Sequence, residues 1–147
     1  MKTLVRATLL ACSVLTLSNA SAQNATTAAA AKEEGAVVTP TGLVYRSLKD
    51  DASANPTANN TVKVHYRGTF PDGKEFDSSY KRGQPIEFPL SGVIKCWTEG
   101  VQRIKVGGKA KLTCPPEIAY GERGAGGVIP PNATLVFEVE LLGINGK

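Results

Sequence analysis

The sequence predicts an α+β domain in which a curved antiparallel sheet packs on a single helix. Most of the chain from Pro40 onward alternates apolar and polar residues with period two, which is typical of strands with one face in the core and one in water. One segment, residues 93–106, instead places apolar side chains three and four positions apart, as a short amphipathic helix does. One-sided alternation favours antiparallel strands, and one helix can cover one face of such a sheet.

The expected elements follow in chain order. A first strand is expected around Leu43 and Tyr45, and a second over residues 62–67, where Val62, Val64 and Tyr66 face one way. A Pro-Asp-Gly turn at residues 71–73 leads to a strand that carries Phe76. The later alternations lie at Ile86, Phe88 and Leu90, at Leu112 and Cys114, and at Leu135, Phe137, Val139 and Leu141.

The predicted helix carries its apolar stripe between two of these strands. Val93, Trp97, Val101 and Ile104 form the stripe. The glycine pair at residues 107–108 is expected to end the helix, because helices commonly end on glycine.

The N-terminus predicts a signal peptide over residues 1–22. Lys2 and Arg6 precede a mostly apolar run, and the small residues 20–22 (Ala-Ser-Ala) are typical of a cleavage site. The apolar run is too short to remain as a membrane span, so we expect a periplasmic or secreted protein. An alternative makes Cys12 a lipid anchor after a lipoprotein cleavage site, and the sequence leaves it open. Residues 23–39 are expected to form a flexible leader and residues 40–147 the domain.

Charge and composition exclude several classes of function. Without Lys2 and Arg6 the 17 basic residues become 15, against 13 acidic ones, a net charge of +2 that does not indicate nucleic-acid binding. We expect no cofactor and no metal, because the sequence carries neither a ligand cluster nor a nucleophile with a base partner. His65, the only histidine, is predicted on the wet face of its strand, and the sequence shows no partner pattern that would indicate a catalytic role.

Cys96 and Cys114 are an even pair in a chain with an export signal, which favours a disulfide between them. Such a bond would stabilise the fold by roughly 3 kcal/mol, mostly by restricting the unfolded chain. Two separate buried thiols are the alternative, because cysteine packs well as a small hydrophobe.

Several separate blocks of the sequence resemble a known family and stand at the spacing expected for that family. In chain order they are residues 62–68 (VKVHYRG), 73–79 (GKEFDSS), 93–97 (VIKCW), 119–121 (AYG) and 129–137 (IPPNATLVF). Over nearly all of residues 40–145 the chain resembles the FKBP-type peptidyl-prolyl cis-trans isomerases, the macrolide-binding immunophilins. The likeness is to exported bacterial members of the Mip type.

The resemblance implies a half-barrel of about five antiparallel strands around the helix, with a proline pocket between them. Trp97 would form the floor of this pocket, and the backbone N–H of Ile94 would hold a substrate carbonyl. The implied catalytic residues are Tyr66, Phe76, Asp77, Ile94, Trp97, Tyr120 and Phe137. The implied substrate-binding residues are Arg82, Ile86, Phe88, Val93, Val128 and Ile129.

The implied activity is acceleration of X–Pro rotation in folding exported proteins, in a dry apolar pocket and without a covalent intermediate. Partners would be unfolded or partly folded proline-containing polypeptides, and macrolide inhibitors are expected to bind. A binding module with little turnover and a purely structural interaction domain are the competing hypotheses, since fold alone does not dictate function.

The chain departs from the family pattern at three positions. Ile86 stands where better-known members have an aromatic residue, Ala125 where they have a histidine, and Cys96 where they have a glycine. The first two departures alter the rim of the pocket and could change which residue is preferred before proline. Mip-type proteins also carry a long dimerisation region, and the short leader here leads us to expect a monomer.

Overall fold

The computed structural model describes residues 19–145, and within them seven strands form one antiparallel sheet. The strand order is β1-β2-β6-β7-β3-β4, and β5 also pairs with β3. The strands are β1 Ala36–Val38, β2 Val44–Lys49, β3 Thr61–Thr69, β4 Glu75–Ser78, β5 Ile86–Pro89, β6 Lys109–Cys114 and β7 Leu135–Asn145.

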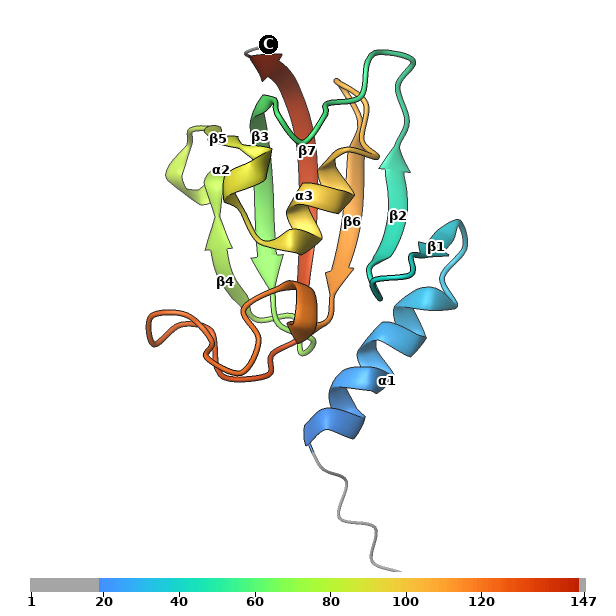
Figure 1. The fold of residues 1–147 in the computed structure, drawn as a ribbon, viewed down its shortest axis with the longest axis vertical. Coiled ribbons are helices and arrows are strands. Elements are labelled where there is room, and N and C mark those ends of the chain that lie inside the picture. Colours follow the sequence, from blue (N-terminus) through green and yellow to red (C-terminus); the bar gives the residue numbers. More distant parts are fainter. Residues whose placement is uncertain (1–18, 146–147) are drawn as a thin grey trace, which may run out of the picture.

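The helices of the same region are α1 Asn19–Ala31, α2 Ser79–Arg82 and α3 Lys95–Val101, with short 3₁₀ turns η1 Leu90–Gly92 and η2 Pro116–Ile118. In Figure 1, α3 lies in front of β6 and β7, whereas α1 lies beneath the β1–β2 edge. None of the described helices has the length and apolar character needed to cross a membrane. The predicted α+β class is confirmed.

The alternation along the central strands decides which side chains enter the core. In β3, Val62, Val64 and Tyr66 are buried while Lys63 and Arg67 are exposed, as period two requires. The same holds for β7, where every second residue from Leu135 to Leu141 is buried. The predicted faces of both strands are therefore confirmed.

The helix α3 is shorter than the predicted helix over residues 93–106. Val93 is extended, and Ile94 is the N-cap, whose carbonyl accepts from the backbone N–H groups of Trp97 (3.0 Å) and Thr98 (3.1 Å). Beyond Gln102 the chain continues in turns, and Ile104 still reaches the core from one of them. The prediction was wrong at both ends because a helical stripe continues into a turn when its side chains still face the core.

The N-terminal segment differs from the flexible leader expected over residues 23–39. Its alanine-rich stretch forms α1, and β1 pairs with β2. Glu33 forms ion pairs with Lys111 (2.7 Å) and Arg46 (3.0 Å), which the linear pattern does not reveal. Of the predicted signal peptide, residues 1–18 lie outside the described residues.

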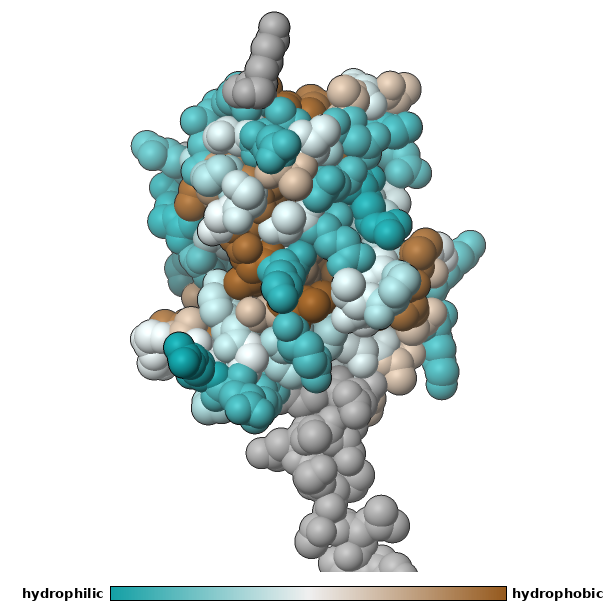
Figure 2. All heavy atoms as spheres, viewed as in Figure 1, coloured by the Kyte–Doolittle hydropathy of each residue, from teal (hydrophilic) through white to brown (hydrophobic). Residues whose placement is uncertain are grey.

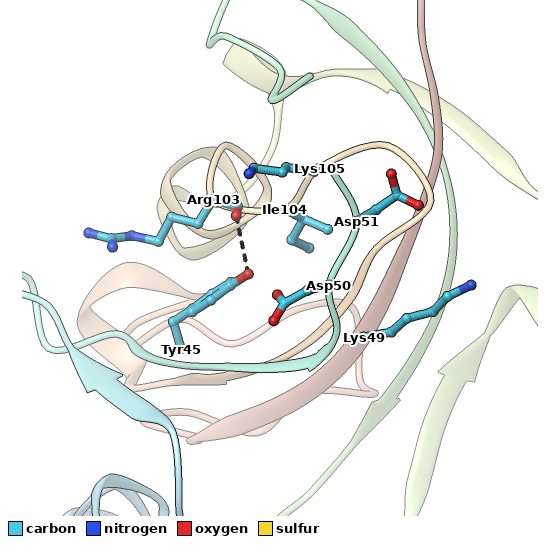
Figure 3. Close-up of a pocket in the computed structure, with 7 residues that line it drawn as sticks. All are labelled: Tyr45, Lys49, Asp50, Asp51, Arg103, Ile104 and Lys105. Carbon is cyan, nitrogen blue, oxygen red and sulfur yellow. Dashed lines mark hydrogen bonds between the residues drawn. The ribbon is translucent and has the colours of Figure 1, made fainter. Parts of the chain in front are cut away.

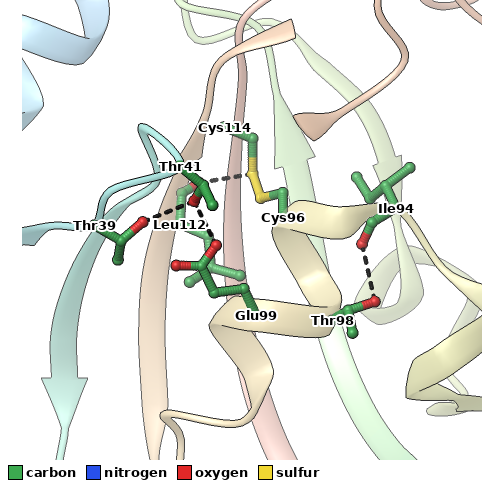
Figure 4. Close-up of a disulfide and its surroundings, with 8 residues drawn as sticks. All are labelled: Thr39, Thr41, Ile94, Cys96, Thr98, Glu99, Leu112 and Cys114. Atoms are coloured by element: carbon green, nitrogen blue, oxygen red, sulfur yellow. Dashed lines mark hydrogen bonds between the residues drawn. A yellow bond between two sulfur atoms is a disulfide. The ribbon is translucent and has the colours of Figure 1, made fainter. Parts of the chain in front are cut away.

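A disulfide joins Cys96, in the first turn of α3, to Cys114, at the end of β6, with the two Cα atoms 5.8 Å apart. Both cysteines are fully buried. Figure 4 shows the bond beside a chain of hydrogen bonds from Thr39 through Thr41 to Glu99 on α3. The predicted disulfide is confirmed, and it ties the start of the helix to the sheet.

Candidate active site: an apolar cavity between sheet and helix

A cavity of about 360 Å³ opens between the sheet and the start of α3. In Figure 2, hydrophobic atoms show near the centre of the face that carries α3, among more polar surroundings. The residues that line the cavity are Tyr66, Phe76, Asp77, Ile86, Phe88, Gly92, Val93, Ile94, Trp97, Tyr120 and Phe137.

Aromatic rings set edge to face build the walls of this cavity. The Trp97 indole meets the ring of Tyr66 at a centroid distance of 5.1 Å and an angle of 83°. It meets the ring of Phe137 at 5.3 Å and 88°, and Phe76 in turn packs on Phe137 at 5.7 Å and 84°. Edge-to-face pairs of this kind are favourable for aromatic quadrupoles, so the rings stabilise one another's positions.

Gly68 makes room for this arrangement. A Cβ atom at Gly68 would lie 2.5 Å from Cζ of Phe76 and 3.0 Å from Cε1 of Phe137. Any larger residue on this part of β3 would therefore displace the two phenylalanines. The family blocks included this glycine, but the sequence analysis did not assign it a role in the site.

The polar wall of the cavity consists of Tyr66 and Asp77, and Arg82, which does not line the cavity, binds both of them. The hydroxyl of Tyr66 donates to Asp77 Oδ2, and Arg82 forms an ion pair with Asp77 Oδ1. Arg82 Nη2 also donates to the hydroxyl of Tyr66 at 3.1 Å, and its guanidinium lies over the Tyr66 ring, 5.8 Å from the centroid. The three side chains come from β3, β4 and α2.

The protonation states of this wall follow from its contacts. Burial raises the pKa of Tyr66, and the hydrogen bond to Asp77 raises it further. Burial alone would raise the pKa of Asp77, but hydrogen bonds from Tyr66 and Arg82 outweigh it, so the pKa lies below its ordinary value. At neutral pH the wall therefore holds a neutral phenol and an ionised carboxylate.

Ten of the thirteen site residues that the resemblance implied line the cavity. The other three do not. Arg82 reaches the wall only through Asp77 and Tyr66, and Val128 is exposed over 56% of its surface. Ile129 is 7% exposed and packs within the core. Gly92 lines the cavity and was not predicted.

The loop that carries Tyr120 is held by its own backbone. The N–H of Asn132 donates to the carbonyl of Gly121 at 2.8 Å, and Ala125 and Ile129 form an isolated β-bridge. Gly124 has a φ of 65°, and a Cβ there would lie 2.2 Å from the carbonyl oxygen of Ile129. Tyr120 itself lines the cavity while remaining 39% exposed, so one side of its ring faces solvent.

His65 does not line the cavity, and its partners in the structure are ones that the sequence pattern did not indicate. Its Nδ1 lies 2.9 Å from Oγ of Ser79, and its ring stacks on Tyr80 at a centroid distance of 4.6 Å. Both partners belong to α2, a helix that the alternation did not predict.

A second cavity, of about 310 Å³, lies between the end of β2 and the turns after α3. Figure 3 shows the hydroxyl of Tyr45 donating to the backbone carbonyl of Arg103, at 3.2 Å. The lining residues are Tyr45, Lys49, Asp50, Asp51, Arg103, Ile104 and Lys105.

Comparisons with known proteins agree with the resemblance. The model of the family described as FKBP-type peptidyl-prolyl cis-trans isomerase matches residues 52–142. The isomerase FkpA of Escherichia coli is 55% identical over 114 residues, which cover 78% of this chain and 42% of that protein. FK506-binding protein 1 of Dictyostelium discoideum is 53% identical over 103 residues, 69% of this chain and 96% of that protein.

The solved structures point the same way. The crystal structure of Escherichia coli FkpA superposes with a TM-score of 0.83 at 50% identity, over 86% of this chain and 59% of that one. The present chain thus spans less than half the length of the Escherichia coli relative, so its likeness is to one part of that protein.

Proposed function

The chain belongs to the FKBP-type peptidyl-prolyl cis-trans isomerase family, and we propose that it accelerates rotation about X–Pro bonds in exported proteins that have not finished folding. The observation that carries this proposal is the cavity of about 360 Å³ whose walls are aromatic rings. A proline ring is small, apolar and rigid, so it suits a cavity walled by rings that hold one another in place.

The physical task is to lower a rotational barrier without making or breaking a σ bond. Rotation about the X–Pro bond must cross roughly 18–20 kcal/mol. The planar amide separates charge between oxygen and nitrogen, and water solvates it well, whereas the twisted amide has lost that resonance. A dry cavity therefore disfavours the planar state more than the twisted one. Each factor of ten in rate requires only about 1.4 kcal/mol of this difference.

Trp97 would form the floor beneath the proline ring, with Tyr66, Phe76 and Phe137 as walls. Their side chains exclude water from the amide nitrogen, whose lone pair is localised in the twisted state. Ile86, Phe88 and Val93 would extend the apolar surface toward the residue that precedes proline. Val128 and Ile129 would border the substrate from the loop that follows Tyr120.

The polar groups would orient the substrate. The backbone N–H of Ile94 would hold a substrate carbonyl at the start of α3, and the exposed side of Tyr120 would contact the peptide. Asp77 faces the cavity while Arg82 and Tyr66 bind it, so its charge is balanced before any substrate arrives. Arg82 would act by fixing Asp77.

An exchange measurement on a short X–Pro peptide tests this proposal directly. In two-dimensional NMR, catalytic amounts of the protein should produce exchange peaks between cis and trans isomers that are absent without it. Trp97→Ala should abolish these peaks, and a macrolide immunophilin inhibitor should suppress them in the wild type. Tyr45→Phe, in the polar cavity, is the matched control and should retain them.

The outcomes separate the proposed enzyme from its rivals. Peptide binding without exchange peaks would mean a binding module, and the proposal would be wrong. If the protein shows neither peptide binding nor exchange peaks, that result would favour a structural domain.

Export of the protein is part of the same proposal. The signal-peptide pattern of residues 1–22 supports it, and so does the disulfide, because such bonds form in oxidising compartments. Mass spectrometry of periplasmic or secreted material should find a mature N-terminus at Gln23. A lipid-modified Cys12 would instead establish the lipoprotein alternative.

A further inference from the structure

The outer edge of β3 is covered by two separate strands with a gap between them. β5 pairs with residues Thr61 to Val64, and β4 pairs with residues Arg67 to Thr69. Within the described residues no strand is paired with this edge at His65 and Tyr66, because the chain leaves the sheet there to form α2. Tyr66 is buried, so its backbone polar groups on that side need another partner.

The hydroxyl of Ser79 fills the gap. Its Oγ accepts from the backbone N–H of Tyr66 at 2.7 Å and lies 3.3 Å from the Tyr66 carbonyl, to which it can donate. The third neighbour of Oγ is Nδ1 of His65, at 2.9 Å. Ser79 is fully buried, so solvent does not replace these contacts.

The same element also holds the tip of the Tyr66 side chain. Ser79 is the first residue of α2 and Arg82 the last, and Asp77 stands two positions before Ser79. Arg82 and Asp77 bind the Tyr66 hydroxyl, while Ser79 binds the Tyr66 backbone. The backbone and the side-chain hydroxyl of Tyr66 are therefore both bound to residues 77–82.

We propose that Ser79 is a positioning residue for the isomerase reaction, acting through Tyr66. It sets the distance between β3 and α2, and with it the place of the Tyr66 ring and of Asp77 in the wall of the cavity. This inference rests on the proposed function, and it adds a residue that does not line the cavity and that the sequence analysis did not assign to the site.

Removal of the hydroxyl should affect the wall more than the fold. In Ser79→Ala the Tyr66 N–H loses its acceptor, and α2 loses its direct bond to the β3 backbone. A wall displaced by a fraction of an ångström weakens transition-state contacts, which are sensitive to small misplacements. We expect kcat/KM to fall about tenfold.

Ser78 provides the matched control. It is the adjacent serine, it is also buried, and its hydroxyl caps α2 by accepting from the backbone N–H of Lys81 at 3.3 Å. Ser78→Ala removes one hydroxyl hydrogen bond without touching Tyr66. We expect kcat/KM to change less than about twofold in this variant. Its loss of thermal stability should be similar to that of Ser79→Ala.

The experiment measures three quantities on wild type, Ser79→Ala, Ser79→Thr and Ser78→Ala. They are kcat/KM by NMR exchange, the midpoint of thermal unfolding, and the hydrogen-exchange rate of the Tyr66 amide. Faster exchange at Tyr66 and lower turnover in Ser79→Ala alone, with both recovered at least in part by the hydroxyl of Ser79→Thr, would support the proposal.

Equal turnover in Ser79→Ala and the wild type would overturn it. So would a loss of turnover that is as large in Ser78→Ala as in Ser79→Ala, because the effect would then follow stability alone. A wild type without isomerase activity would overturn the proposed function, and the positioning role with it. The Tyr66 amide rate would still report whether Ser79 holds the backbone of β3.

Discussion

The apolar cavity beside α3 and the polar cavity at the end of β2 differ little in volume and greatly in chemistry. The apolar one measures about 360 Å³ and the polar one about 310 Å³. Aromatic and aliphatic side chains dominate the first, whereas five of the seven residues around the second carry a charged side chain. Volume alone therefore does not identify a site for rotation about an X–Pro bond. Only the apolar cavity has walls that can exclude water from that bond.

Tyr45 in the polar cavity and Tyr66 in the apolar cavity sharpen the contrast. Burial raises the pKa of both Tyr45 and Tyr66. The Tyr45 hydroxyl is bound to a backbone carbonyl at the end of α3, so it stabilises a turn. The Tyr66 hydroxyl is bound to Asp77 and Arg82 in the cavity wall, so its position sets the shape of that wall.

The largest effect is expected from Phe137→Ala, which opens the apolar cavity. The ring is almost fully buried and packs on Trp97 and Phe76, so its loss should cost about 3–5 kcal/mol of stability. Turnover should fall at least about tenfold, because water then reaches the amide. Chemical denaturation and NMR exchange on the same sample measure the two effects. Full activity in a folded variant would contradict the assignment of the wall.

The next effect in size concerns the disulfide that fixes the start of α3. The double variant Cys96→Ser, Cys114→Ser should lose roughly 3 kcal/mol of stability, since the bond closes a loop in the unfolded chain. Thiol titration of the denatured wild-type protein from an oxidising compartment should find neither cysteine free. Two titratable thiols in that material would show that the bond does not form there.

A smaller loss is expected from Asp77→Leu, which removes the charge from the polar wall. Asp77 keeps 39% of its side chain exposed, so the fold should remain nearly intact. Turnover should fall about threefold to tenfold, because Tyr66 and Arg82 lose the acceptor that aligns them. Far-UV circular dichroism is the control for folding. Unchanged turnover would remove Asp77 from the site.

The same carboxylate predicts a response to acid. Its pKa is lower in the folded protein than in the unfolded chain, so the stabilisation is fully present above the unfolded pKa of about 3.9. It is lost as the pH falls through the lowered folded pKa. Between pH 5 and 2, the wild type should therefore lose more stability than Asp77→Asn, as measured by denaturant midpoints. Parallel curves would indicate that Asp77 is not held in its charged form.

Substitutions in the polar cavity should have little effect on catalysis. Asp50→Ala removes a charged lining residue, and Tyr45→Phe removes the bond to the carbonyl of Arg103. Both variants should keep kcat/KM within about twofold of wild type, although Tyr45→Phe should lose about 1 kcal/mol of stability. A tenfold loss of kcat/KM in either variant would mean that residues of the polar cavity contribute to catalysis.

The smallest expected effect is that of pH near neutrality. If desolvation carries the catalysis, no group at the reacting bond gains or loses a proton, and turnover should be nearly flat from about pH 6 to 8. His65→Gln should likewise have little effect, because Ser79 retains its bonds to Tyr66. A bell-shaped profile in this range, or inactive but folded His65→Gln, would indicate acid–base chemistry.

The sequence was most informative where a pattern is local. Period-two alternation predicted the buried faces of β3 and β7, and the helical stripe predicted that Trp97 enters the core. The sequence did not predict the first and last residues of α3, or that residues 19–31 form the helix α1. They depend on contacts made across the fold, such as the ion pair of Glu33 with Lys111.

For the site, the spacing of the family blocks led to most of the lining residues. The contacts of Ser79 with Tyr66 were missed because they fill a gap between two strands that no single strand pattern contains. Gly92 was missed because it lies in a turn between the alternation that ends at Leu90 and the helical stripe that begins at Val93, where the sequence analysis expected no element. Gly68 left a usable signal, since a glycine within a strand often marks a close approach.

The pairing of β3 with β7 also constrains how the protein itself is made. Residues as far apart as Thr61 and Asn145 lie opposite each other in the middle of the sheet. Since β7 follows every other described strand in the chain, a ribosome must deliver it before β3 and β6 can be joined. Until then the incomplete sheet exposes the apolar faces of both strands and their unpaired edges. A chain that would be threaded unfolded through a translocation channel benefits from this order, because the sheet cannot close early and block its passage.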